Sequence, residues 1–136
     1  MIEAKEDFNN TWPFKANFFS GNGFKQHYVD EGKENKKVIL CLHGEPTWGY
    51  IYRHFIRELS KDFRVVVPDL MGFGKSETPK NKEYSLKTHV ENLENLVNYL
   101  ELENIYFVGQ DWGGPILGAY TSVSYTHLTL PTTSSV

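Results

Sequence analysis

The chain has a single cysteine, Cys41, in 136 residues, which excludes an internal disulfide and favours a reducing compartment. No apolar run approaches the roughly 20 residues of a membrane-spanning helix. The N-terminus, MIEAKEDF, is charged and lacks the apolar core of a secretory signal. The formal net charge of −3 provides no broad basic surface for nucleic acid. We therefore expect a soluble, cytoplasmic globular protein with no nucleic-acid or membrane partner.

Charge is also absent from the end of the chain. All 31 Lys, Arg, Asp and Glu residues lie within residues 1–111, and none lies from Trp112 to Val136. The segment VSYTHLTLPTT resembles the translation of a transposon-end sequencing adapter. This resemblance predicts that residues 122–136 are a non-native tail and that residues 1–121 are the natural sequence. The alternative is a flexible, Ser/Thr-rich terminus.

Buried strands alternate with amphipathic helices along most of the chain. Nearly continuous apolar runs at 37–43, 63–70 and 104–110 are typical of strands buried on both faces. Helical spacing of apolar residues predicts helices over 50–60 and 85–100, and a third helix is predicted to begin at 113–120. The predicted inward-facing residues are Tyr52, Phe55, Ile56 and Leu59 in the first helix, and Leu86, Val90, Leu93, Val97 and Leu100 in the second. Ser85 is the expected N-cap of the second helix.

These elements predict an α/β fold with a parallel sheet covered by helices on both faces. An antiparallel hairpin precedes it, because the aromatic runs at 14–20 and 24–30 are separated by GNG, which favours a tight turn. Ligands bind at the carboxyl ends of the strands in such sheets. The loops expected there are HGEPTW, DLMGFGKSE and QDWGG.

The last of these loops, within VGQDWGG, has the G-x-X-x-G pattern of a hydrolase nucleophile turn with Asp111 at its centre. The alternative is that Asp111 only caps the following helix. Serine at this position attacks acyl carbon, whereas a carboxylate that attacks alkyl carbon forms an ester that water can still hydrolyse. Aspartate is ionised at neutral pH and needs no base for this attack. The residue type therefore indicates an sp³ carbon with a leaving group as the target.

Hydrolysis of that ester requires two N–H donors for the oxyanion. The residue after the nucleophile, Trp112, supplies one backbone N–H in this kind of turn. Glu45 in HGEPTW is the expected second backbone donor, in a loop that Pro46 makes rigid. The Trp112 indole N–H is also a candidate ligand for a departing halide, although a structural tryptophan is the alternative.

Together, HGEPTWGYIYR, VPDLMGFGKS and VGQDWGGP resemble the α/β-hydrolase superfamily, and specifically the haloalkane dehalogenases, from about residue 12 to residue 120. The resemblance implies Asp111 as nucleophile, Glu45 and Trp112 as oxyanion donors, and Trp112 as halide ligand. It implies no metal and no organic cofactor. The expected partners are a small halogenated alkane, a halide ion and water.

The chain departs from this family after the nucleophile, where the family has its acid and then its histidine. No acidic residue follows Asp111, and the one later histidine, His127, lies in the predicted tail. His43 is expected to be a structural loop residue. We therefore expect the N-terminal half of the fold, with an exposed or half-buried strand at 104–110, poor solubility or incomplete folding, and no catalytic turnover.

Three other functions are alternatives to this one. An epoxide hydrolase uses the same aspartate, but often has histidine before it, where this chain has Gln110. The loop GFGKS suggests a nucleotide site, but Asp69 and Glu77 occupy positions where the glycine motifs need glycine. That loop is therefore interpreted as a turn with Lys75 in solvent. A non-catalytic receptor or scaffold with this fold is the third alternative.

Overall fold

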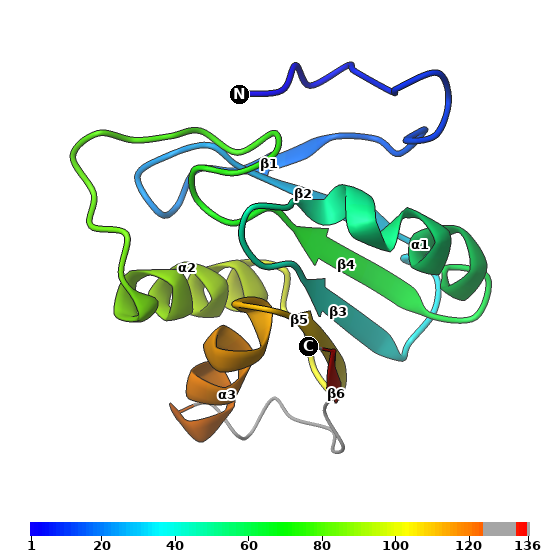
Figure 1. Ribbon diagram of the computed structural model, residues 1–136. Coiled ribbons are helices and arrows are strands. Elements are labelled where there is room, and N and C mark those ends of the chain that lie inside the picture. The colour runs from blue at the N-terminus through cyan, green and yellow to red at the C-terminus, as the bar shows by residue number, and fades with distance from the viewer. Residues whose placement is uncertain (124–132, 136) are drawn as a thin grey trace.

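The strands of the computed structural model form one mixed sheet in the order β1-β2-β4-β3-β5-β6, which Figure 1 shows with helices packed against it. The structure describes residues 1–123 and 133–135. In chain order the elements are β1 (Asn17–Phe19), β2 (Gln26–Glu31), β3 (Val38–Leu42), the 3₁₀ helix η1 (Gly49–Tyr52), α1 (Arg53–Leu59), β4 (Arg64–Pro68), α2 (Leu86–Tyr99), β5 (Ile105–Gln110), α3 (Gly113–Val123) and β6 (Thr133–Ser135). The parallel strands β4, β3 and β5 and the antiparallel β1–β2 hairpin confirm the predicted α/β class.

Residues alternate along β3 between the two faces of the sheet. Leu40 and Leu42 face α2 and α3, where Leu93, Val97 and Ile116 complete one buried cluster. Ile39 and Cys41 face α1 and pack with buried residues of a second cluster, which includes Trp12 and Ile56. All five residues of β3 are buried, which confirms the prediction of a strand covered on both faces from its continuous apolar run.

The loop that connects the two strands of the hairpin is longer than the sequence predicts. The strands shorten to Asn17–Phe19 and Gln26–Glu31, and of the two glycines in GNG only Gly23 has a positive φ, +84°. Asn22 in this longer loop reaches α2: its buried side chain donates to the Asn92 carbonyl, 3.1 Å away, and accepts from Asn95 Nδ2 at 2.8 Å. The turn therefore serves to join the hairpin to α2.

Two helices differ in detail from their predictions. The first begins as η1, and within α1 Phe55 is 46% exposed while Ile56 is fully buried, so the predicted core position of Phe55 is wrong. In α2, the Ser85 hydroxyl accepts a hydrogen bond from Thr88 N–H, which confirms the N-cap. Leu86 is 41% exposed because it begins the helix, whereas Leu96, absent from the predicted stripe, is fully buried.

β5 is half-buried, as expected, because its side chains alternate between buried and intermediate positions. It is not the edge of the sheet, since Val108, Gly109 and Gln110 pair in parallel with residues 133–135 of β6. The prediction of an exposed edge at 104–110 is therefore wrong for the sheet as described. Residues 124–132, with His127 and most of the predicted tail, lie outside the described residues. No described helix is both long and apolar enough to span a bilayer.

Candidate active site

Asp111 occupies a sharp turn between β5 and α3. Its φ of +55° lies in the left-handed region, which costs a non-glycine residue roughly 1–2 kcal/mol. The turn requires small neighbours on both sides. A Cβ on Gly109 would lie 3.0 Å from Gly114 N, and a Cβ on Gly113 would collide with the backbone of Leu42 and His43. These close approaches explain Gly109 and Gly113 of VGQDWGG and agree with a sharp turn between strand and helix.

The Asp111 carboxylate faces the loop after β3. Its Oδ2 accepts a hydrogen bond from the backbone N–H of Glu45 at 3.2 Å, across 66 residues of sequence. Gly44 permits this approach, since a Cβ there would lie 2.7 Å from Oδ2. Among the described residues, the carboxylate makes its hydrogen bond with Glu45 rather than with the first turn of α3, so the alternative that Asp111 is only an N-cap is not supported.

His43 holds this loop from inside the protein. It is fully buried, Nδ1 lies 2.7 Å from the Gly44 carbonyl, and Nε2 lies 2.8 Å from the Leu70 amide. An amide can only donate, so Nε2 accepts and Nδ1 carries the proton. Burial lowers the pKa of His43, which favours this neutral form. Both ring nitrogens are engaged, so His43 has the structural role expected from its position and is not a free base.

Trp112 and Glu45 lie at the exposed side of the turn. The Trp112 side chain is 48% exposed, unlike the buried tryptophan Trp12. The Glu45 side chain is exposed too, so its backbone, not its carboxylate, faces Asp111. The three predicted site residues are thus gathered in one place, at the carboxyl ends of β3 and β5.

His89 belongs to the surroundings of this loop and was missed by the sequence analysis. It is 7% exposed on α2, and burial lowers its pKa, while the charge of Glu45 acts in the opposite direction. A histidine within an amphipathic helix has no sequence signal for this position, because only tertiary packing brings α2 toward the β3 loop.

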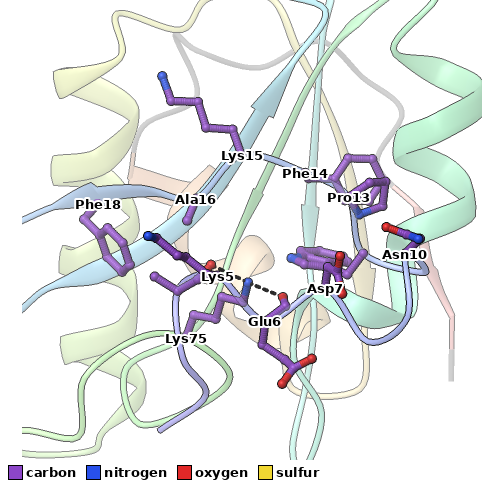
Figure 2. Close-up of a pocket in the computed structure, with 12 residues that line it drawn as sticks. Lys5, Glu6, Asp7, Asn10, Pro13, Phe14, Lys15, Ala16, Phe18 and Lys75 are labelled. Atoms are coloured by element: carbon purple, nitrogen blue, oxygen red, sulfur yellow. Dashed lines mark hydrogen bonds between the residues drawn. The ribbon is translucent and has the colours of Figure 1, made fainter.

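Lys75 is buried, which contradicts its predicted place in solvent. It is 2% exposed, and Nζ donates to the carbonyls of Ala4 and Glu6, both at 2.8 Å. Figure 2 shows these bonds beside a cavity of about 560 Å³ under the N-terminal segment. The prediction failed because the covering segment lies some 70 residues earlier in the chain. The residues that line this cavity include none from the Glu45 loop or the Asp111 turn.

No group of three or more His, Cys, Asp or Glu side chains arranged to hold a metal ion occurs among the described residues.

Comparison with known sequences gives a consistent family. Residues 37–128 match the family described as the alpha/beta hydrolase fold. The chain is 42% identical to haloalkane dehalogenase 2 of Mycobacterium tuberculosis over 105 residues, which are 77% of this chain and 36% of that protein. It is 39% identical over 113 residues to cis-3-alkyl-4-alkyloxetan-2-one decarboxylase of Shewanella oneidensis, covering 81% of this chain and 35% of that protein. The chain thus spans about a third of the length of these relatives.

Solved structures share the same fold. A haloalkane dehalogenase from Paraglaciecola agarilytica superposes with a TM-score of 0.82 at 36% identity, covering 88% of this chain and 42% of that chain. An epoxide hydrolase from Vigna radiata gives the same TM-score at 29% identity, covering 90% and 38%. Because the two scores are equal, the fold itself does not discriminate between these activities.

Proposed function

Because the chain belongs to the α/β-hydrolase family, we propose that it is part of a hydrolase that cleaves carbon–halogen bonds of small haloalkanes through an ester of Asp111. The observation that carries the proposal is the hydrogen bond between Glu45 N–H and Asp111 Oδ2, 3.2 Å long. It leaves Oδ1 as the attacking oxygen and holds a donor beside the carbonyl that the ester would have. The identity with haloalkane dehalogenases supports the choice of substrate class.

In the first step, a carboxylate oxygen of Asp111 forms a bond to the carbon that bears the halogen. The carbon–halogen bond breaks, and its electron pair leaves with the halide. The exposed Trp112 indole is a donor that can solvate this ion. No proton is transferred in this step, so it needs no base.

In the second step, water adds to the ester carbonyl, and the alcohol leaves to regenerate the Asp111 carboxylate with release of a proton. The negative oxygen of the intermediate would be stabilised by the backbone N–H groups of Glu45 and Trp112. This step needs a base to activate water. His43 is engaged on both ring nitrogens, so we propose that the 136-residue chain stops at the ester.

The test is to incubate the folded chain with a primary bromoalkane and to follow bromide release and intact mass. We expect one bromide per chain, a mass increase of one alkyl group in place of hydrogen, and mapping of the modification to Asp111. Asp111→Asn should abolish all three signals, while Asp7→Asn, at an exposed aspartate of the N-terminal segment, should not. Equal modification of the wild-type chain and the Asp111→Asn variant would exclude Asp111 as the nucleophile.

An epoxide hydrolase of the same fold is the second candidate, supported by the likeness to the Vigna radiata enzyme. It would attach a whole epoxide to Asp111, with a mass increase equal to the complete reagent and no halide release. A folded chain that reacts with neither reagent would favour the non-catalytic scaffold.

A further inference from the structure

We propose that Asp69 is a positioning residue, which acts through the loop of residues 44–48 to hold the Glu45 N–H against Asp111. The proposal rests on the proposed function for its chemical consequence. Its structural part, that one buried carboxylate fixes this loop, can be tested separately.

The Asp69 carboxylate joins three segments that are far apart in sequence. The residue follows β4 directly and has no exposed surface. Its Oδ1 accepts from the Gly49 amide at 2.7 Å, at the end of the Glu45 loop. Its Oδ2 accepts from the Lys75 amide at 2.9 Å and lies 2.8 Å from His27 Nδ1 on β2.

Two glycines allow their loops to approach the Asp69 carboxylate closely. A Cβ on Gly49 would lie 3.1 Å from Asp69 Oδ1, and one on Gly74 would lie 2.7 Å from Asp69 Cγ. Gly74 also has a φ of +56°, which a larger residue adopts only with strain. The approach of both loops to the carboxylate thus depends on residues without side chains.

The same short segment anchors both ends of the Glu45 loop. Asp69 holds Gly49 at the far end of the loop through its side chain. The next residue, Leu70, donates its amide to His43 at the near end, and His43 in turn holds the Gly44 carbonyl. Between these anchors the loop bonds to itself, from the Thr47 amide and hydroxyl to the Gly44 carbonyl, and Trp48 packs against aromatic side chains. The two anchors at the end of β4 join this loop to the sheet, and so help to set its position against Asp111.

His27 and Asp69 form a His–Asp pair of the kind found in catalytic sites, but both side chains are buried out of reach of a substrate. Both side chains are completely inaccessible to solvent. Among the described residues, His27 Nε2 has no hydrogen-bond partner, so it is not aligned with a substrate-activating group. The pair instead ties the carboxylate to β2.

An Asp69→Asn substitution tests the inference, because it keeps the size and removes one acceptor atom. One oxygen cannot serve both the Gly49 and Lys75 amides, which approach different carboxylate oxygens. Asp30→Asn is the matched control: it is a buried aspartate on β2, whose carboxylate pairs at 2.7 and 2.9 Å with Arg64, the first residue of β4. Both variants exchange a buried carboxylate for an amide, but only the first touches the loop.

The first readout is amide hydrogen exchange in the 136-residue chain. In Asp69→Asn we expect exchange at Gly49 and Glu45 to accelerate about tenfold or more, as loss of a hydrogen bond to a charged group implies, with Leu40 in β3 unchanged. In Asp30→Asn, Gly49 and Glu45 should keep their wild-type rates. Unchanged exchange at Glu45 in Asp69→Asn, or equal acceleration in both variants, would overturn the proposal.

The second readout is the rate of Asp111 alkylation by a bromoalkane, expressed per folded chain. We expect about a tenfold loss in Asp69→Asn and no loss in Asp30→Asn, because a carboxylate that the Glu45 N–H no longer orients presents its attacking oxygen less often, and a small misplacement of a reacting group can cost up to about 10²-fold. Altered exchange with an unaltered alkylation rate would refute the link to the chemistry. No alkylation in the wild-type chain would contradict the proposed function while leaving the exchange test intact.

Discussion

Replacing Gly113 by alanine tests whether α3 packs as closely against β3 as the structure shows, because close packing predicts a large loss of stability. Gly113 is the first residue of α3 and is buried against β3. An added Cβ would lie 2.8 Å from the Leu42 carbonyl carbon and 2.9 Å from the His43 oxygen, and closer still to the Leu42 oxygen. These are backbone atoms in the sheet and in the loop that carries Glu45, so they cannot rotate out of the way.

The magnitude follows from this geometry. Ordinary contacts of a Cβ begin at 3.4 Å and the Leu42 oxygen is the nearest atom, so α3 must retreat from β3 by about an ångström, which loosens Ile116 and Leu117 in the core. Forcing extra volume into a packed site typically costs 1–3 kcal/mol, and we expect about 3 kcal/mol here because backbone atoms resist. With a urea dependence of about 1–3 kcal/mol per molar, the unfolding midpoint should fall by about 1–3 M.

Gly118→Ala is the matched control in the same helix. Gly118 is exposed, and its added Cβ would have no atom within 4 Å, so alanine should stabilise the chain by up to about 1 kcal/mol through helix propensity. The assay is urea unfolding followed by circular dichroism and tryptophan fluorescence. If Gly113→Ala unfolds at the wild-type urea concentration, or if both variants shift it in the same direction, the close packing of α3 on β3 is refuted.

Three further predictions use buried groups. Burial raises the pKa of Cys41 to about 12, so the native chain should resist a thiol reagent at pH 8 and react fully in urea; rapid labelling of the native chain would contradict its burial. Burial lowers the pKa of His89, so near neutral pH the unfolded chain binds more protons than the folded chain. The free energy of unfolding should therefore fall as the pH drops from about 7.5 through 6.5. Urea titrations of His89→Leu should show a smaller fall. Lys75→Met should speed trypsin cleavage after Lys5 by freeing the N-terminal segment, while Lys15→Met, at an exposed lysine of the same cavity, should leave it unchanged, as mass spectrometry can measure.

The sequence predicted those parts of the site that local rules determine. Apolar runs predicted β3, β4 and β5, and in a parallel sheet their carboxyl ends must share one edge, so Asp111 and Glu45 were expected to meet. The glycines of VGQDWGG reflect backbone contacts that any such turn requires. These features depend on strand direction and turn geometry, and a few neighbouring residues determine both.

The features that were missed depend on contacts between distant segments. Lys75 is buried only because residues 4–6 cross over it, and no pattern near GFGKS signals this. Phe55 has the spacing of a core residue, but it lies at the edge of the buried stripe of α1 and is half exposed, whereas Ile56 is fully buried. The sequence around Asp69 indicates only that a nucleotide motif is absent there, although the Asp69 carboxylate accepts hydrogen bonds from two loops. Such roles follow from tertiary packing, which overrides local propensity.

The register between β3 and β5 explains why so small a set of elements can assemble the nucleophile and its donor. Leu42 lies opposite Gly109, so the residues after this pair, from His43 and from Gln110 onward, run side by side. A shift of one residue would turn the side chains of β5 to the opposite face and carry Asp111 away from Glu45. The register is in turn secured by alternating burial, since Leu40 and Phe107 are paired and face the same core. The alignment of Asp111 with its donor is therefore a consequence of core packing, and the glycines at 44 and 113 allow the two chains to approach as closely as that register demands.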